Sequence, residues 1–183
     1  MGKIIAFEWI SVDGVFDANN MEQWFFPYNT PARQQFIKET YQQADAFLMG
    51  RTTYEMLAPH WSQLSDKEER GVAGILTHTP KFIVSDGSAV ADWGDTTIIK
   101  GDVEAEVKKL KHDVENIMII GSSTLAESLA EAGLIDEYKL LVHPFIMGTG
   151  QSFFREGMKT PMQLAEVKKL DQDLLLLHYR VKK

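Results

Sequence analysis

The sequence predicts an α/β fold built on a largely parallel central sheet. Short apolar runs rich in Ile, Val, Phe and Leu alternate with segments of helical periodicity along most of the chain. Alternation of this kind is typical of parallel strands joined by helices that cover both faces of the sheet. The last strands follow one another without helices between them, which indicates an antiparallel end to the sheet.

The apolar runs and the helical segments place each element. We expect strands at 3–10, 45–49, 81–85, 96–100, 116–120, 137–147, 163–170 and 174–181. We expect helices at 31–44, 53–61, 66–77, 102–112 and 123–132. Pro31 suits the first turn of the first helix, and Gly133 suits the end of the last. Because no linker or change in composition divides the chain, we expect one domain that spans residues 1–183.

Composition excludes several classes of protein. A net charge of -7 argues against a nucleic-acid surface, which needs clustered Lys and Arg. The chain has no Cys and no pair of His residues at ligand spacing, so we expect no disulfide and no metal site. No apolar segment reaches the ~18 residues of a membrane span, and the N-terminus lacks a cleavage motif. We therefore expect a cytoplasmic protein without a membrane partner.

Two strand-to-helix junctions have the composition of an anion site, "LMGRTTYEML" at 48–57 and "MIIGSSTLAESL" at 118–129. The first N–H groups of a helix lack partners and carry partial positive charge, so they attract phosphate. Gly50 and Gly121 let the chain turn sharply there. Arg51 adds a forked cation. The hydroxyl donors are Thr52, Thr53, Ser122, Ser123 and Thr124.

A second interpretation of both junctions stays open. Thr52-x-x-Glu55 and Thr124-x-x-Glu127 match the capping box, which stabilises a helix and needs no ligand. The arginine favours an anion at the first junction. The G-x-G-x-x-G fingerprint is absent, which disfavours a Rossmann domain.

Two acidic residues are candidates for a catalytic acid. Asp13 lies at the start of a segment of about 20 residues, 11–30, and segments that long are usually functional or mobile. It is equally explained as a turn residue before Gly14. Glu8 interrupts an apolar strand and is expected either to face solvent or, if buried, to have a raised pKa that suits a proton donor.

Several motifs, taken in order, resemble the dihydrofolate reductase-like family. The chain contains "SVDG" (11–14), "TPARQQFIKETYQQ" (30–43), "DAFLMGRTTYE" (45–55), "IIGSSTLAESLAEAGLIDEYKLLVHP" (119–144) and "GTGQSFF" (148–154). Their combination is most similar to the reductase domain of the bifunctional riboflavin-biosynthesis deaminase/reductase and its stand-alone relatives. The resemblance implies a three-layer dihydrofolate reductase-like fold, NADPH as cofactor and a homodimer.

The resemblance also implies a role for each turn. The residues Gly50, Arg51, Thr52 and Thr53 are expected to bind the pyrophosphate and the adenosine-side phosphate, with Arg51 favouring NADPH over NADH. The stretch Gly121 to Leu125 (with Ser122, Ser123 and Thr124) is expected to contact the pyrophosphate or the nicotinamide ribose. Ser85 resembles the position near the adenosine 2′-phosphate. The chain departs from the family at Ser122, where a second glycine is more common, and at Asp86, which follows Ser85.

The substrate end differs from that of true dihydrofolate reductases. Arg33 occupies the helix position where those enzymes carry the substrate-binding carboxylate, so the sequence argues against dihydrofolate reduction. Arg33 is expected to bind an anionic substrate or to lie exposed at the helix start. Trp24 is a candidate lid over a flat heterocycle, whereas Phe25 and Phe26 are expected to anchor the loop. His143 is expected to be a hydrogen-bonded sheet histidine.

These observations predict an NADPH-dependent reductase of a small heterocyclic substrate. The nearest named activity is the 5-amino-6-(5-phosphoribosylamino)uracil reductase of riboflavin biosynthesis, although the chain lacks the zinc deaminase motif that accompanies it. Three alternatives stay open. The first is a non-catalytic NADP(H)-binding protein of the same fold, and the second is an enzyme of that fold with another substrate. The third is an interaction domain in which both turns serve only as helix caps.

Overall fold

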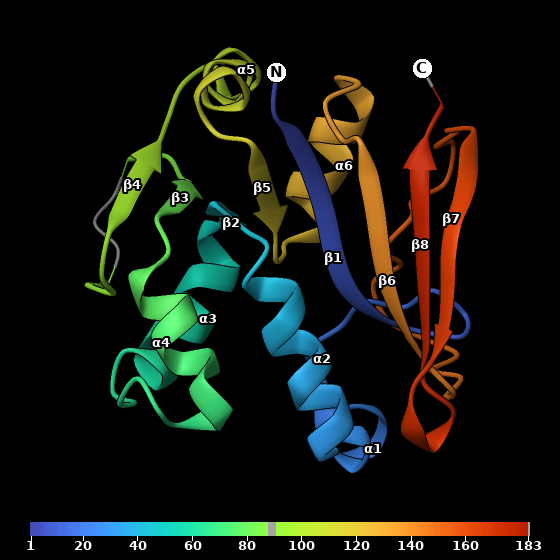
Figure 1. The fold of residues 1–183 in the computed structure, drawn as a ribbon. Coiled ribbons are helices and arrows are strands. Elements are labelled where there is room, and N and C mark those ends of the chain that lie inside the picture. The colour runs from blue at the N-terminus through green and yellow to red at the C-terminus, as the bar shows by residue number, and fades with distance from the viewer. Residues whose placement is uncertain (88–90, 183) are drawn as a thin grey trace.

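The computed structural model describes residues 1–87 and 91–182, in which the strands form one eight-stranded sheet (Figure 1). Its order is β4-β3-β2-β5-β1-β6-β8-β7. The strands are β1 (Lys3–Ser11), β2 (Ala46–Gly50), β3 (Lys81–Val84), β4 (Thr96–Ile99), β5 (Asn116–Ile119), β6 (Glu137–His143), β7 (Met162–Lys169) and β8 (Leu175–Val181).

The sheet is parallel from β4 to β6 and antiparallel beyond it. The pairs of β1 with β5 and β6, of β2 with β3 and β5, and of β3 with β4 are all parallel. The two remaining pairs, β6 with β8 and β7 with β8, are antiparallel. Consequently the six parallel strands bring their carboxyl ends to one edge of the sheet. The predicted class, with its antiparallel C-terminal strands, is confirmed.

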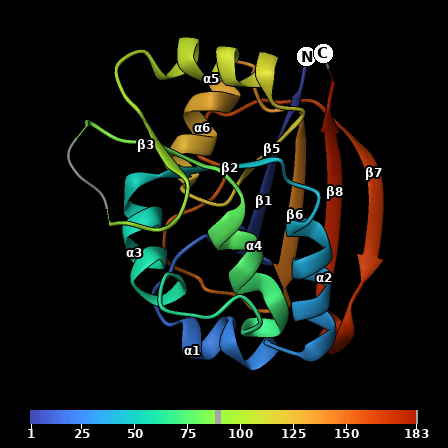
Figure 2. The ribbon, with the colours of Figure 1, turned by 60° about the vertical axis from the view of Figure 1, so that its left-hand side comes forward.

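Helices cover both faces of the sheet (Figure 2). One face buries its apolar side chains against α5 (Val103–Asp113) and α6 (Ser123–Glu131). The other face packs against α2 (Pro31–Tyr41), α3 (Arg51–Trp61) and α4 (Val72–His78). The short elements are α1 (Met21–Trp24) and three 3₁₀ turns, η1 (Phe26–Tyr28), η2 (Glu69–Gly71) and η3 (Asp171–Asp173).

Two predicted elements differ most from the structure. The helix predicted at 66–77 is wrong at its start, because Glu69 and Arg70 have positive φ angles of 46° and 56° that no right-handed helix accepts. The helix α4 begins only after Gly71. The strand predicted at 137–147 ends at His143, since Pro144 has no N–H to donate to a neighbouring strand.

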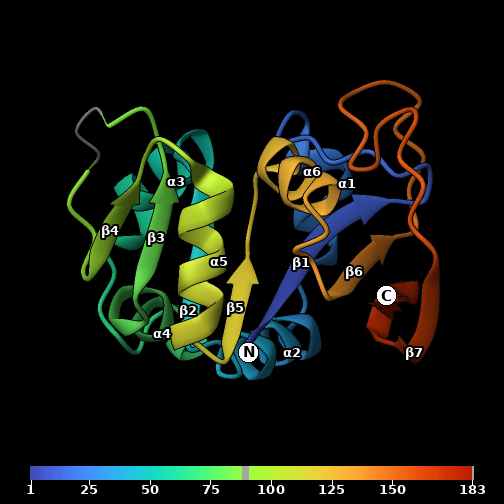
Figure 3. The ribbon, with the colours of Figure 1, turned by 90° about the horizontal axis from the view of Figure 1, so that it is seen from above.

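The segment after β1 and the segment after β6 lie side by side (Figure 3). Val15 and Ser152 form an antiparallel bridge, and Phe16 N donates to Gln151 O at 2.8 Å. The long segment 11–30 is therefore partly ordered by the loop that follows β6, and it also contains α1 and η1. Within the described ranges, no helix has the length and apolar character needed to cross a membrane.

Candidate functional site

The two predicted turns meet at the carboxyl edge of the sheet. The strands β2 and β5 are parallel neighbours, so the turns that follow them are adjacent. Gly50 N donates to Gly121 O at 3.2 Å. A Cβ on Gly50 would lie 2.7 Å from Ser122 Oγ, and a Cβ on Gly121 would lie 2.7 Å from Thr53 Oγ1. Because no side chain fits at either glycine, the backbones of the two turns form one compact cradle.

At the first junction the helix N-terminus is not capped by a side chain. Gly50 is the N-cap residue of α3, and the helix begins at Arg51. Thr52 lies inside the first turn, so the capping box predicted for Thr52 and Glu55 is wrong. Glu55 instead accepts a hydrogen bond from Arg51 Nε at 2.8 Å. The partial positive charge of this N-terminus is therefore left for a ligand.

At the second junction the helix caps itself. Ser122 is the N-cap residue of α6, and its Oγ accepts a hydrogen bond from Leu125 N at 3.3 Å. The capping box predicted for Thr124 and Glu127 is wrong, because the cap lies two residues earlier. Glu127 pairs with Arg155 Nε at 2.9 Å instead.

The remaining hydroxyls of this turn bond to the loop after β6. Ser123 is buried and its Oγ accepts from Gln151 Nε2 at 2.6 Å. Thr124 Oγ1 accepts from Arg155 Nη2 at 3.1 Å. Both hydroxyls are thus engaged within the protein, and what the turn offers a ligand is chiefly its backbone.

Arg51 is the cation at the cradle, and two carboxylates hold it. Besides Glu55, it pairs through Nη1 with Asp86 Oδ1 at 3.0 Å. Asp86 Oδ1 also accepts from Ser85 Oγ at 3.3 Å, at the carboxyl end of β3. The structure thus brings Arg51 and Ser85 together, with a carboxylate between them. A phosphate that binds Arg51 must compete with Asp86.

The Glu8 carboxyl group binds the backbone of the second turn from inside the sheet. Its side chain is fully buried, so the solvent-facing alternative is wrong. Its Oε1 accepts from Gly121 N at 2.7 Å, whereas Oε2 has no hydrogen-bond partner among the described residues. Burial raises the pKa of this carboxyl well above 4.5, and the Gly121 hydrogen bond opposes that rise only in part. Glu8 therefore holds a proton next to the cradle more readily than an exposed glutamate.

Asp13 is held by hydrogen bonds that keep it ionised. Its carboxylate accepts from Ser11 Oγ at 2.6 Å, from Met147 N at 3.1 Å and from Gly148 N at 2.8 Å. The Ser11 hydroxyl, followed by the two backbone donors, lowers the pKa of Asp13 to about 2. Its geometry is that of a residue that fixes the loop after β6, which favours the turn interpretation over a proton donor.

The two predicted substrate residues lie on the α2 face of the sheet, with Trp24 in a cluster of aromatic rings and Arg33 against the Phe25 ring of that cluster. Trp24 is buried, and its Nε1 donates to Asn19 O at 3.2 Å. Arg33 is buried as well, so the alternative of an exposed arginine at the helix start is wrong. Thr30 caps that helix by accepting from Arg33 N at 3.2 Å. This positions the guanidinium inward, where its carbon lies 4.0 Å from the centre of the Phe25 ring.

His143 lies beneath the aromatic residues of the segment 11–30. It is fully buried at the end of β6, but neither ring nitrogen has a partner at hydrogen-bond geometry among the described residues. Burial lowers the pKa of His143, but the backbone of Ile10 and that of Leu141 interact with the ring and raise this pKa in part, so the expectation of a hydrogen-bonded sheet histidine stays a prediction. Its place opposite Ser11 follows from the parallel pairing of β1 with β6, which no local sequence pattern shows.

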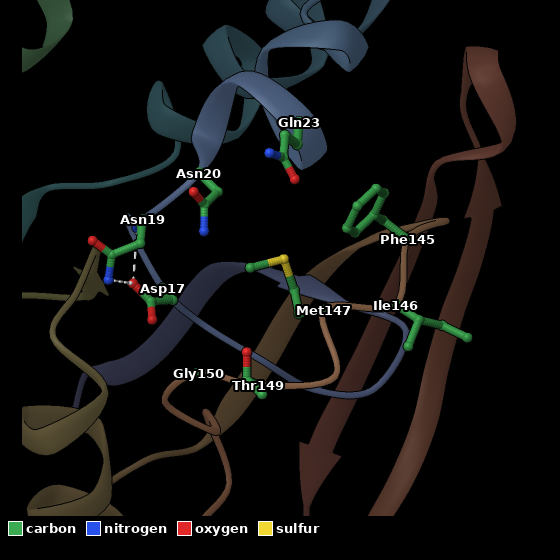
Figure 4. Close-up of a pocket in the computed structure, with 9 residues that line it drawn as sticks. All are labelled: Asp17, Asn19, Asn20, Gln23, Phe145, Ile146, Met147, Thr149 and Gly150. Atoms are coloured by element: carbon green, nitrogen blue, oxygen red, sulfur yellow. Dashed lines mark hydrogen bonds between the residues drawn. The ribbon is translucent and has the colours of Figure 1, made fainter.

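A pocket of about 500 Å³ opens between the two long loops (Figure 4). Asn19, Asn20 and Gln23 line it from the segment after β1, and Phe145 and Met147 line it from the loop after β6. Asp17, Ile146, Thr149 and Gly150 complete the described lining. The pocket adjoins the cradle through Gln151, which follows Gly150 and bonds to Ser123.

The fold recurs in solved structures. The chain superimposes with a TM-score of 0.75 on a protein from Shewanella sp. PV-4 that is provisionally named a riboflavin biosynthesis protein, at 18% identity and covering 99% of each chain. It superimposes with a TM-score of 0.72 on a pyrimidine reductase-like protein from Corynebacterium diphtheriae, at 12% identity, covering 100% of this chain and 92% of that one. These structural similarities confirm the expected dihydrofolate reductase-like arrangement. At identities of 18% and 12%, they establish only the fold.

The sequence itself is similar to known proteins as well. The uncharacterised protein YyaP of Bacillus subtilis is 24% identical over 147 residues, which cover 79% of this chain and 76% of the relative. The family model of the RibD C-terminal domain matches residues 2–176. This match spans nearly the whole chain and includes both turns of the cradle, and the chain therefore belongs to the RibD C-terminal domain family.

Proposed function

We propose that the protein is an NADPH-dependent reductase of a small heterocyclic substrate. The observation that carries this proposal is the cradle, in which the uncapped N-terminus of α3 and the backbone turn before α6 adjoin, with Arg51 beside them. Glycine at both turns lets the two turns pack closely together, because a Cβ at Gly50 or Gly121 would collide with Ser122 or Thr53, and this packing brings the two helix N-termini to one place. Thr52, Thr53 and Leu125 belong to the first turns of the two helices and complete the proposed contacts.

The chain's own groups fit the chemistry of such a reaction. A bound nicotinamide supplies the hydride, which adds to the carbon of a C=O or C=N bond, while a proton goes to the heteroatom. Glu8 is the better of the two candidate acids, because burial favours its protonated form, whereas Asp13 stays ionised. The residues that orient the substrate are proposed to come from Trp24, Arg33 and the pocket beside them.

The reduction of 5-amino-6-(5-phosphoribosylamino)uracil is the nearest named activity for this family. A panel assay tests it directly. The purified protein is mixed with NADPH and, in turn, with that pyrimidine, with its non-phosphorylated form and with dihydrofolate, and loss of the nicotinamide absorbance is followed. We expect oxidation with a pyrimidine and none with dihydrofolate. Oxidation with dihydrofolate alone would contradict the proposed substrate class.

One observation favours the non-catalytic alternative. The side chains of Trp24, Phe25 and Tyr28 surround His143, which leaves Arg33 and His143 closed to a substrate in this conformation. Saturable NADPH binding without oxidation in the presence of any member of the panel would support that alternative.

A further inference from the structure

The pocket of about 500 Å³ between the two long loops has a lining that is polar but carries no positive charge. Its volume lies in the range of roughly 300–1,000 Å³ that is usual for small-molecule sites. Among the described lining residues, Asp17 is the one with a charge, and none is Lys, Arg or His. Proteins normally bind a phosphate group with such cations or with the N-terminus of a long helix. The lining is therefore not that of an anion site.

The two arginines of the adjoining segments do not supply the missing cation. Arg33 is buried, and its Nη1 donates to Phe25 O at 3.2 Å. Arg155 follows the loop that lines the pocket, but it pairs through Nε with Glu127 at 2.9 Å and donates through Nη2 to Thr124 Oγ1 at 3.1 Å. Neither arginine belongs to the lining, so a phosphate in the pocket would meet the Asp17 carboxylate without a cation beside it.

The Asp17 carboxylate is fixed by its own loop through one of its two oxygens. Its Oδ1 accepts hydrogen bonds from Asn19 N at 2.8 Å and from Asn19 Nδ2 at 2.6 Å. A Cβ on Gly150 would lie 3.1 Å from Asp17 Oδ2, so the glycine leaves the space beside that oxygen open. The carboxylate thus has a defined position and an oxygen that can accept a hydrogen bond from a ligand.

The remaining polar side chains extend toward one another across the pocket (Figure 4). Asn20 is the N-cap residue of α1, but its side chain makes no capping hydrogen bond, so its amide is available to a ligand. Gln23 lies beside it, and Thr149 and Met147 face both from the loop after β6. An amide and a hydroxyl group each supply a donor and an acceptor, as do the hydroxyl groups of a polyol. The Met147 side chain suits the C–H groups of such a chain.

We propose that this pocket binds an uncharged polyhydroxyl group and that Asp17 excludes a phosphate from it. A carboxylate accepts hydrogen bonds from hydroxyl groups and repels a phosphate, which is specificity by repulsion. The inference rests on the proposed function in one respect. The pocket adjoins the α6 turn through Gln151 and the candidate substrate residue Trp24 through Gln23, so the bound group is a substituent of the reduced heterocycle. The substrate is accordingly a heterocycle whose hydroxylated substituent carries no phosphate.

A matched pair of ligands tests the pocket without any cofactor. Saturation-transfer NMR titration of the whole protein compares D-sorbitol with D-sorbitol 6-phosphate, which differ only in the phosphate. We expect sorbitol to bind the wild type at least about fivefold more tightly than its phosphate. Asp17→Asn should reduce this ratio to about twofold or less, because it removes the repelling charge. The control is Asp113→Asn, since Asp113 is exposed at the end of α5, outside the pocket.

A second variant separates hydrogen bonding from repulsion. Gln23→Met removes the amide at similar length, and we expect it to weaken sorbitol binding by about threefold or more while sorbitol 6-phosphate stays the weaker ligand. The proposal is overturned if sorbitol 6-phosphate binds the wild type as tightly as sorbitol does, if neither ligand binds, or if Asp17→Asn keeps the wild-type ratio.

The reductase assay distinguishes a failure of this proposal from a failure of the proposed function. We expect kcat/KM for the non-phosphorylated pyrimidine to exceed that for its phosphate by at least about fivefold. Selective binding of sorbitol by a protein that oxidises no NADPH with any member of the panel would overturn the reductase function and leave the pocket standing. NADPH oxidation that is more efficient with the phosphorylated pyrimidine would do the reverse.

Discussion

The junctions before α3 and α6 share a sequence pattern but differ in how their helix N-termini are satisfied. Gly50 leaves the first turn of α3 uncapped, and Arg51 adds a cation beside it. Ser122 caps α6 with its own side chain, and Glu8 holds the preceding backbone at Gly121 N. The comparison indicates a division of roles. We propose that the α3 junction neutralises the charge of a phosphate, and that the α6 junction supplies a fixed backbone surface against which the ligand packs.

Gly121→Ala is expected to have the largest effect on this pair of turns. Gly121 has a φ of 82°, and an added Cβ would lie 2.7 Å from Thr53 Oγ1, so both backbone strain and collision oppose the substitution. We expect a loss of about 3 kcal/mol or more in the free energy of unfolding, measured with urea. Gly101→Ala is the control, because Gly101 has a φ of 80° and open space around it. Equal losses in the two variants would show that the turns do not pack as described.

Glu8→Gln is expected to remove a dependence of stability on pH. The folded-state pKa of Glu8 is raised above 4.5, so the folded state binds the proton more tightly than the unfolded state. The wild type should therefore lose stability as pH rises from about 4.5 through the folded pKa, by about 1.4 kcal/mol for each unit of elevation. The variant should lack this loss and be at least as stable at pH 7. Urea unfolding at a series of pH values measures the free energy of unfolding of both proteins.

The exposed residue Glu131 provides the control for that experiment, because Glu131→Gln makes the same chemical change at the surface of α6. A profile that is the same in the wild type and in Glu8→Gln would contradict the assignment of a raised pKa to Glu8.

Asp86→Asn is expected to increase the difference between the affinity for NADPH and the affinity for NADH. Asp86 holds Arg51 at 3.0 Å and places a negative charge where a 2′-phosphate would bind the same guanidinium. Removing that charge should raise the affinity for NADPH by about five- to tenfold, which corresponds to roughly 1 kcal/mol. The affinity for NADH, which has no 2′-phosphate, should change little. Fluorescence titration measures both, and an equal change for the two cofactors would place Asp86 outside the phosphate site.

Ser122→Ala is expected to have the smallest effect, a loss of about 1 kcal/mol in the free energy of unfolding through the lost cap on Leu125 N. Thr124→Ala should cost less, because Thr124 lies inside the helix and bonds only to the exposed Arg155. Thermal or urea unfolding measures the loss of stability in each of the two variants. A larger loss for Thr124→Ala would restore the capping box predicted from the sequence.

The parts of the fold that follow from local patterns could be predicted from the sequence. The strands were placed to within a residue or two, except that the one predicted at 137–147 was given four residues too many. Both glycine turns lie where the pattern indicated, and parallel pairing of β2 with β5 brings them together. The assignment of the capping residues failed, because Thr52 and Thr124 match the capping box but lie two residues after the actual N-cap residues, Gly50 and Ser122, and only the backbone conformation decides between them.

The burial of charged side chains could not be predicted, because it depends on packing between distant segments. Glu8 is buried through its contact with Gly121, and Arg33 through its contact with Phe25. In the same way, the pKa of Asp13 follows from Met147 and Gly148, which no local pattern connects to it. The single domain, the homodimer, the cytoplasmic location and the roles of individual residues stay predictions.

Titration of the protein with NADPH and NADH, for the wild type, Arg51→Ala and the control Arg70→Gln, tests the central claim that the two turns form a dinucleotide-phosphate site. We expect saturable NADPH binding that Arg51→Ala weakens by about 10- to 100-fold, with a smaller effect on NADH and none from Arg70→Gln. If neither nucleotide binds at millimolar concentration, or if Arg51→Ala binds NADPH as tightly as the wild type, the cradle is not a site for these phosphates.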